Sequence, residues 1–490
     1  MTKLKKGGLL LLLAIAILIA VLLTRTASFT PSEQYQQFSA RNVQVDANQV
    51  ANHLSEAIRF KTVSHDDWRQ REDDQYEGFL AWIAATYPEV QSQLTLERVN
   101  DFTLLYRWKG KQSNEPAVLM SAHYDVVPVN PGTESLWEHA PYAGEIADGY
   151  IWGRGSLDDK SAVIALLEAT TLLIKQGYEP QGDVYLAFTH DEEIGSVYGS
   201  QAVTELFKGR DIKLAWTLDE GSFVLDGMVP GVSRKIASVN IAEKGYLTLE
   251  FVAHGQGGHS SMPPQDTAVS ILAEAIVKLK NAPVPGGLEG LSEQLYTEMA
   301  KYMPYSKRLL FANSWLFKPL IEKEMGKIPS GNAMLRTTTA PTMLEGSVKA
   351  NVLPITAKAK VNFRIHPRDN VESVIAYVKG VINDDRIDIN VVREFEASNV
   401  SDKNANGFNK IAAAAREVHG DDVIVTPGLT IAATDSRYYS EITNSYRFNP
   451  MSITSQDLAG FHGTNERISI DNMVKAVEFY ARLMSSEQPK

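Results

Sequence analysis

The sequence contains no cysteine among its 490 residues. This absence excludes a disulfide framework and a thiolate metal ligand, so a bound metal ion would rest on imidazole and carboxylate groups, which suit zinc, cobalt or manganese. The chain also lacks an excess of positive charge, because its formal net charge is −11. Nucleic-acid-binding proteins usually carry a basic patch that neutralises phosphates. The composition therefore argues against nucleic acid as a partner.

One long apolar run stands at the amino terminus, from Leu9 to Leu23. Three lysines lie within the first six residues and Arg25 follows the run, which is the charge order of an export signal or a signal anchor. No small-x-small cleavage site precedes Ser28, which favours an uncleaved membrane helix over a cleaved signal peptide. The positive-inside rule then places the body outside the cytoplasm, and cleavage of the segment would make the protein secreted.

The length exceeds what one compact core usually serves, so two folded domains are expected behind this segment. Residues 1–28 are predicted to be the anchor or signal, and the mostly polar residues 29–45 a tether. The catalytic domain is predicted to occupy residues 46–242 and 398–490. An inserted α+β lid domain is predicted at residues 243–397.

The first domain has the rhythm of an α/β fold. Apolar runs at residues 117–122, 184–189 and 214–218 predict buried strands, and a helix is predicted at residues 162–174, between the first two. Strand, helix and strand in this order predict a mainly parallel central sheet flanked by helices. Helices predicted at residues 409–418 and 471–484 resume this rhythm near the end of the chain.

The pattern changes after residue 243. Polar and apolar side chains alternate at residues 246–253 and 358–365, as in half-exposed strands, and a helix at residues 371–382 and a strand at residues 387–392 follow. These elements predict the separate α+β unit. Residues 291–345 are predicted to be helical decoration of it.

Potential metal ligands follow the predicted strands. His123 and Asp125 stand two residues apart on extended chain and point to the same side, so the aspartate can fix which imidazole nitrogen faces a metal. Taken alone, this pair is more typical of a hydrogen-bonded histidine at a strand end than of a ligand.

Two further acidic clusters follow. A glycine-rich turn at residues 153–156 delivers Asp158 at a helix start, where Asp158 and Asp159 are also expected to cap the helix. Glu192 and Glu193 are adjacent, so at a strand end they would diverge, and one could bind a metal while the other faces a water. Paired glutamates are also common on solvated loops.

These motifs occur in a fixed order, and Gly460–Glu466, which reads Gly-Phe-His-Gly-Thr-Asn-Glu, closes the set. The ordered set resembles the dizinc metallopeptidase superfamily of glutamate carboxypeptidase, aminoacylase and succinyl-diaminopimelate desuccinylase. The Leu-Asp-Glu-Gly form at residues 218–221, the length of the insertion and the amino-terminal segment look most like the carboxypeptidase S branch. That branch includes the N-fatty-acyl-amino-acid synthase/hydrolases.

The resemblance implies two zinc ions at one site, with cobalt or manganese as alternatives. By position, His123 and Asp219 would hold one ion, and Glu193 and His462 would hold the other. Asp158 would bridge both ions.

The resemblance also implies roles for neighbouring residues. Asp125 would orient His123, and Glu192 would be the general base. Many relatives have Glu-Pro-Thr where this chain has Asp219 and Glu220, so Glu220 stays open as an alternative ligand to the preferred Asp219.

Residues of the inserted domain match motifs of the family that approach the substrate. His259 resembles the lid histidine that donates a hydrogen bond to the oxyanion, in many members across a dimer interface, so a homodimer through this domain is one expected arrangement. Asn351 and Arg364, together with Arg437 of the catalytic domain, match positions that bind the substrate's carboxylate or carbonyl. Each of the first three also fits a plain surface role, as a solvated loop histidine, a turn residue and an exposed strand arginine.

Residues and resemblance together predict a zinc-dependent metallopeptidase or amidohydrolase that cleaves an amide bond adjacent to a free carboxylate. The expected substrate is a short peptide or an N-acyl amino acid. One alternative is an exported dipeptidase or deacylase of cell-wall fragments. Another is a non-catalytic binding protein on the same fold.

Overall fold

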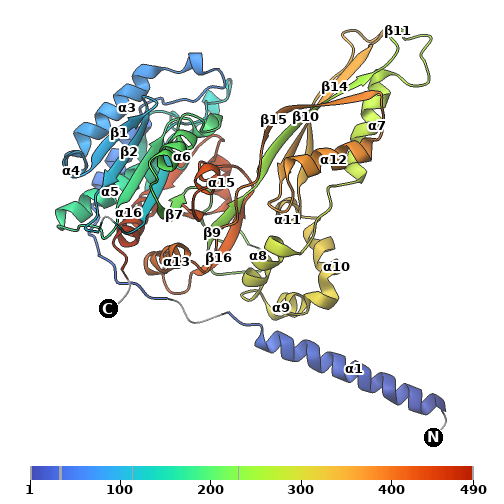
Figure 1. The fold of residues 1–490 in the computed structure, drawn as a ribbon, viewed down its shortest axis with the longest axis horizontal. Helices are drawn as coiled ribbons and strands as arrows, with labels where there is room; N and C mark the ends of the chain where they lie inside the picture. Colours follow the sequence, from blue (N-terminus) through green and yellow to red (C-terminus); the bar gives the residue numbers. More distant parts are fainter. Residues whose placement is uncertain (1–2, 32–35, 113, 230, 488–490) are drawn as a thin grey trace. The chain divides into compact units, whose positions relative to one another are not determined.

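Figure 1 shows the computed structural model, which describes residues 3–31, 36–112, 114–229 and 231–487. The chain divides into two compact units. The large unit consists of Glu33–Ala242, Asn399–Thr430 and Thr434–Lys490, and the inserted unit consists of Met1–Ser32, Glu243–Ser398 and Ile431–Ala433. The central segment of the inserted unit differs by one residue from the range 243–397 expected from sequence.

A ten-stranded sheet forms the centre of the large unit. Its middle strands lie in the order β6 (Val184–Thr189), β3 (Ala117–His123), β7 (Leu214–Asp219) and β17 (Ser445–Arg447), and each neighbouring pair is parallel. Every residue of β6 is buried, as expected for a strand covered on both faces. The predicted mainly parallel central sheet is therefore confirmed.

Antiparallel strands extend this sheet on both sides. They are β1 (Thr95–Val99) and β2 (Thr103–Trp108) beyond β6, and β9 (Ile236–Glu243) and β8 (Val224–Leu225) beyond β17. Two further strands lie on the β17 side: β18 (Ser452–Ile453), which is parallel to β8, and β16 (Ile424–Thr430), which pairs with β9. A small sheet combines β4 (Glu145–Ala147), β5 (Tyr150–Trp152) and β19 (Arg467–Ser469). The helices of the large unit are α2 (Ala47–Ile58), α3 (Asp73–Thr86), α4 (Pro88–Gln93), α5 (Lys160–Lys175), α6 (Ser200–Gly209), α13 (Asn406–His419), α14 (Ser436–Tyr439), α15 (Ser455–Gly460) and α16 (Ile470–Met484).

Helix α5 lies against strand β3 and helices α2 and α16, and nearly all of its side chains are buried. Its start differs from the sequence prediction. Asp159 occupies the N-cap position, but within the described chain its side chain makes no capping hydrogen bond, and Asp158 is also not the cap. The expected capping role is therefore wrong. The Asp158 side chain contacts His123 and His462 instead.

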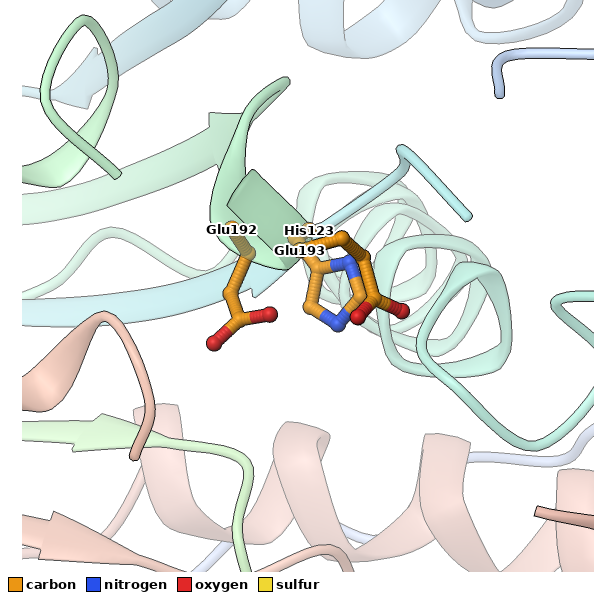
Figure 2. A group of neighbouring side chains, drawn as sticks. All are labelled: His123, Glu192 and Glu193. Atoms are coloured by element: carbon orange, nitrogen blue, oxygen red, sulfur yellow. The ribbon is translucent and has the colours of Figure 1, made fainter. Parts of the chain in front are cut away.

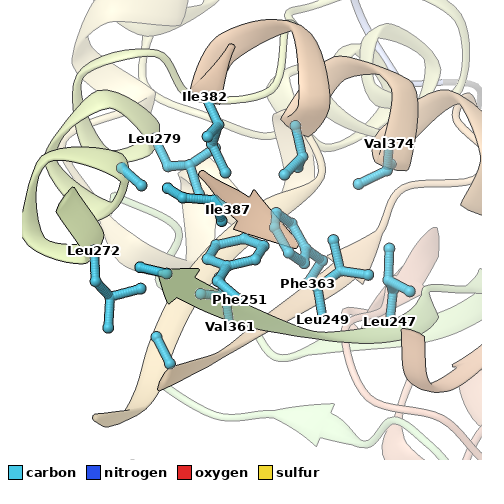
Figure 3. Packing of buried hydrophobic residues seen from close by; sticks show 14 of the residues in the cluster. Leu247, Leu249, Phe251, Leu272, Leu279, Val361, Phe363, Val374, Ile382 and Ile387 are labelled. Atoms are coloured by element: carbon cyan, nitrogen blue, oxygen red, sulfur yellow. The ribbon is translucent and has the colours of Figure 1, made fainter. Parts of the chain in front are cut away.

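The inserted unit contains a four-stranded antiparallel sheet in the order β12 (Thr338–Glu345), β14 (Thr356–Ile365), β10 (Gly245–His254) and β15 (Ile387–Phe395). Helices α7 (Ala268–Asn281) and α12 (Val371–Ile382) contact this sheet and each other. Alternate residues of β10 and β14, among them Leu249, Phe251, Val361 and Phe363, form the buried core under these helices (Figure 3). The alternation that predicted half-exposed strands is confirmed.

The predicted helical decoration is confirmed only in part. Residues 290–335 contain α8 (Gly290–Ala300), α9 (Tyr305–Ala312), α10 (Ser314–Met325) and α11 (Pro329–Leu335). The prediction is wrong for Thr338–Glu345, which forms strand β12. This strand lies at the sheet edge and its residues are partly or fully exposed, so its sequence carries no apolar alternation that would predict a strand.

Helix α1 (Lys3–Ser28) covers the apolar amino-terminal run. Among the helices of the described ranges, only α1 has a segment, Gly7–Ser28, long and apolar enough to cross a membrane, and a signal sequence passes the same test. Of the expected tether, residues 29–31 and 36–45 form no helix, and residues 32–35 lie outside the described part of the chain.

Candidate metal centre

The ends of three parallel strands bring the predicted ligands to one edge of the large sheet. Strand β3 ends at His123, β7 ends at Asp219 and is followed by Glu220, and β6 leads into the 3₁₀ turn η3 (Glu192–Ile194). Because β6, β3 and β7 are parallel neighbours, their carboxyl ends lie together, where open α/β sheets form their sites.

One group of ligands surrounds the Nε2 atom of His123. This nitrogen lies 3.0 Å from Oδ1 of Asp158 and 3.5 Å from Oε1 of Glu220. On the other side of the ring, Nδ1 lies 2.9 Å from the carbonyl oxygen of Asp125 and 3.4 Å from its Oδ1. An Nδ1–H that donates to Asp125 leaves the Nε2 lone pair facing the two carboxylates, as in a metal-binding histidine.

A second group surrounds Nε2 of His462. It lies 2.8 Å from Oδ2 of Asp158 and 3.3 Å from Oε1 of Glu193. Asp158 thus presents one carboxylate oxygen to His123 and the other to His462. This is the arrangement that a carboxylate shared by two cations requires.

Glu192 belongs to a third group with His123 and Glu193, in which one ligand atom of each lies within 4.8 Å of the others. Figure 2 shows that the two glutamates leave the turn in different directions, with their carboxylates on either side of the His123 ring. The expected divergence is present, although it arises on a 3₁₀ turn rather than at the strand end.

Asp125 organises both halves of this arrangement. Its Oδ1 and Oδ2 accept hydrogen bonds from the backbone N–H groups of Glu192 and Glu193, both at 3.2 Å, and Oδ2 also accepts from Ser64 Oγ at 2.6 Å. Asp125 therefore holds the imidazole of His123 mainly through its backbone carbonyl, and the turn that carries the glutamates through its carboxylate.

The structure separates the two candidate acids at the end of β7. Among the described residues, the groups that could hold a metal include Glu220 but not Asp219. Adjacent residues of an extended chain face opposite ways. The Asp219 side chain lies near Asp435 and Ser436, and burial followed by the charges of Asp435 and Glu220 raises the pKa of Asp219 well above its usual range. The geometry thus favours the alternative ligand, Glu220, over the preferred Asp219.

The buried carboxyl groups of the site have too few positive charges near them to balance their own negative charge. Burial, followed by the charge of Asp158, raises the pKa of Glu193 to about 7. Burial is also the main cause that raises the pKa of Glu192 well above its usual range, and that of Glu220 is raised in the same way. Burial alone would lower the pKa of His462, but hydrogen bonds to Asp158 and Glu193 raise it to about 10. Divalent cations would supply the missing charge.

The donor set fits such cations. It consists of imidazole nitrogens and carboxylate oxygens, which zinc, cobalt and manganese accept. Tetrahedral ligands with bonds of about 2.0 Å lie roughly 3.3 Å apart. The distances between ligand atoms around His123 and His462, from 2.8 to 3.5 Å, lie close to this spacing.

Sequence reasoning missed a buried residue that supports the site. Glu466 Oε1 accepts hydrogen bonds from the backbone N–H groups of Leu157 (2.8 Å) and Asp158 (3.1 Å), and its Oε2 lies 2.6 Å from Arg154 Nη1. Glu466 is fully buried and stands four residues after His462. It therefore ties the turn that carries Asp158 to the loop that carries His462. The acidic residue that ends the last motif was the signal that could have indicated it.

The predicted substrate residues are divided between the units. Arg437 lies on α14 of the large unit, where its Nη2 donates to the carbonyl of Gly195, directly after η3, and its guanidinium lies 4.8 Å from the ring centre of Tyr438. This arginine is thus placed beside the turn that carries Glu192 and Glu193.

The other three substrate residues lie in the inserted unit. His259 is exposed on β11 (Gly258–His259), and its Nδ1 accepts the backbone N–H of Ser261 at 3.1 Å. Asn351 is exposed, and its carbonyl accepts a hydrogen bond from Ser260 N at 3.2 Å, so it lies beside His259. Arg364 lies on β14 with its guanidinium 4.9 Å from the ring centre of Tyr246.

The chain is similar in sequence to several known proteins over most of its length. The N-fatty-acyl-amino acid synthase/hydrolase PM20D1 of Xenopus tropicalis is 35% identical over 484 residues, which cover 97% of this chain and 94% of that protein. The probable carboxypeptidase S-like 2 of Dictyostelium discoideum is 38% identical over 448 residues, covering 90% of this chain and 85% of that protein. Carboxypeptidase S of Saccharomyces cerevisiae is 29% identical and covers 88% of this chain and 83% of its own.

Solved structures share the fold. The M20 family metallo-carboxypeptidase Sso-CP2 from Sulfolobus solfataricus has a TM-score of 0.63 at 20% identity and covers 89% of this chain and 98% of its own. The family model of peptidase family M20/M25/M40 matches residues 119–486, a range that contains the whole ligand cluster. The chain therefore belongs to peptidase family M20/M25/M40 and is an enzyme of the metallopeptidase class.

Proposed function

We propose that this protein is a dinuclear metal-dependent hydrolase that cleaves an amide bond next to a free carboxylate, in a short peptide or an N-acyl amino acid. The observation that carries the proposal is the Asp158 carboxylate, which offers one oxygen to each of two histidines. The named activities of the carboxypeptidase S and N-fatty-acyl-amino acid hydrolase relatives support the choice of substrate class.

The proposed ligands are His123 and Glu220 for one cation and His462 and Glu193 for the other, with Asp158 shared. Zinc is the expected metal, with cobalt or manganese as substitutes for the same donors. When bound, the cations would supply Lewis acidity that polarises the substrate carbonyl and lowers the pKa of water.

Glu192 is the proposed general base. Its carboxylate would take a proton from the attacking water and then deliver it to the leaving amine. Burial raises the pKa of Glu192 well above its usual range. The hydrogen bond from the Glu192 N–H to Asp125 holds this side chain beside the ligands.

The remaining predicted residues would bind the substrate. The planar guanidinium of Arg437 can hold both oxygens of a carboxylate. A histidine ring whose Nδ1 accepts a hydrogen bond from a backbone N–H, as that of His259 does from Ser261, carries a proton on Nε2. His259 is therefore prepared to donate to an oxyanion, and Asn351 and Arg364 are proposed to contact the substrate from the inserted unit.

Helix α1 is proposed to be an uncleaved membrane anchor that holds the two units outside the cytoplasm. The support is its apolar segment Gly7–Ser28 and the three lysines that precede it in the sequence.

The test of the proposed function uses the full chain in detergent with a panel of N-acyl amino acids and dipeptides. Glu192→Gln should lower turnover by about 10²- to 10⁴-fold, the usual contribution of a general base, while the metal content stays the same. Glu205→Gln is a matched control, because Glu205 is an exposed glutamate on α6. Unchanged turnover in Glu192→Gln would refute the assignment of the base, and no turnover of any substrate by the zinc-loaded wild type would refute the proposed activity.

A further inference from the structure

The carboxyl end of α1 is hydrogen-bonded to helices α9 and α10 of the same unit. Arg25 Nε donates to the carbonyl of Ala312 at 3.1 Å, and Arg308 Nη2 donates to the carbonyl of Thr26 at 3.2 Å. Asn313, the buried residue between α9 and α10, donates from Nδ2 to Thr26 Oγ1 at 3.3 Å. The Arg308 bond reaches a carbonyl of the last turn of α1, where carbonyls lack their usual partners within the helix, and the three bonds together fix this end on the helix pair.

Helix α10 exposes an apolar face directly after this contact. Trp315, Leu316 and Leu320 are 57%, 42% and 45% exposed, and Pro319 lies exposed between them. Tyr305, at the start of α9, is 52% exposed. Single exposed apolar residues are common, but several on one face of one helix pair indicate a surface that binds an apolar partner.

The same helix pair is basic in an otherwise acidic chain. Residues 301–328 contain six lysines and arginines and two glutamates, whereas the whole chain has a formal net charge of −11. Tryptophan, tyrosine and leucine on one face, with lysines beside them, are typical of helices that lie in the interface of a bilayer with anionic lipids.

We propose that α9 and α10 lie in the outer interface of the bilayer, with Trp315, Leu316 and Leu320 in contact with lipid. This inference rests on the proposed anchor. If α1 spans the membrane, its carboxyl end lies at the outer interface, and Asn313, which is bonded to that end, lies at the same depth. The exposed face of α10 begins two residues later, so the bilayer is the partner next to it.

The absence of cysteine allows a direct test with single spin labels in the full chain. Trp315→Cys and Leu320→Cys would be labelled in nanodiscs of phosphatidylcholine and phosphatidylglycerol, and the collision rates of the label with oxygen and with a water-soluble nickel chelate would be measured. Met262→Cys is the aqueous control, because Met262 is 81% exposed in the same unit. Ala16→Cys, in the middle of α1, reports whether the anchor spans the bilayer.

The labels at positions 315 and 320 should collide several-fold more with oxygen than with the nickel chelate, as the label at position 16 should, whereas the label at position 262 should show the opposite preference. Labels at 315 and 320 that behave like the label at 262, with position 16 in lipid, would overturn the proposed surface and leave the anchor standing. An aqueous label at position 16 would overturn the anchor and this surface together. Turnover of a water-soluble dipeptide by the unlabelled protein tests the proposed hydrolase separately.

Discussion

Replacing each of the two adjacent acids at the end of β7, Asp219 and Glu220, tests the proposed assignment of the metal ligands. Glu220→Gln and Asp219→Asn each keep the shape of the side chain and remove its charge. Glu220 Oε1 lies 3.5 Å from Nε2 of His123, within the spacing of ligands on one cation, whereas Asp219 faces Asp435 and Ser436. We expect Glu220→Gln to weaken one of the two cation sites and Asp219→Asn to leave both filled.

The size of the effect follows from the position of Glu220. Loss of a group that only orients a ligand lowers metal affinity by about 10- to 100-fold. Glu220 is itself a proposed ligand, in a group with His123 and Asp158, so its loss should exceed this range. A fall of at least about 100-fold in affinity corresponds to about 2.8 kcal/mol, since each factor of ten is about 1.4 kcal/mol.

The assay is the number of metal ions per chain after dialysis against a weak chelator, measured by inductively coupled plasma mass spectrometry, together with turnover. Wild type and the control Glu205→Gln should keep two ions per chain. Glu220→Gln should keep one, with turnover lost and then restored in part by excess zinc. If Asp219→Asn loses an ion while Glu220→Gln keeps two, the geometric reasoning fails and the preference inferred from sequence is right.

Two further outcomes follow from buried groups. Glu466→Gln removes the negative charge from the buried ion pair with Arg154. The free energy of unfolding of the metal-free protein, measured by urea denaturation, should therefore fall by about 3–5 kcal/mol. An unchanged value would show that this ion pair does not hold the turn that carries Asp158. Burial lowers the pKa of His190 to about 4, so the folded protein keeps this ring neutral while the unfolded chain takes up a proton below pH 6.5. Stability is therefore unaffected by this group above pH 6.5 and falls towards pH 4 by about 1.4 kcal/mol per pH unit. His190→Gln, which can keep a hydrogen bond to Thr103, should remove that part of the slope between pH 6.5 and pH 5, and an identical slope would contradict the assignment.

Much of the fold could be predicted because periodicity is a local signal. Helix α12 has the bounds expected from sequence, and β10 and β14 extend the expected strands by one or two residues at their ends. Strand β12 could not be predicted, because an exposed edge strand is paired on one side only and its side chains are not selected by a core.

The order of chemical motifs along the chain was sufficient to place the protein in its family. Four side chains predicted from it as ligands, His123, Asp158, Glu193 and His462, lie in groups of neighbouring side chains that could hold a metal ion. His123 ends strand β3, Glu193 follows β6 and Asp158 precedes α5, whereas His462 lies in the loop between α15 and β19. The acidic residue that ends the last motif could have indicated Glu466, but its partners could not be predicted, because they lie about 310 residues away along the chain.

The sequence by itself determined that imidazoles and carboxylates gather at the carboxyl ends of parallel strands. Hydrophobic runs define the strands, and the order of strand, helix and strand places their carboxyl ends at one edge of the sheet. The sequence could not determine which of two neighbouring acids turns towards His123. Side chains of an extended strand point to alternate sides of the sheet, so a shift of one residue in the pairing of β7 would turn Asp219 instead of Glu220 towards His123. Only the pairing of β7 with β3 and β17 in the folded sheet establishes that register.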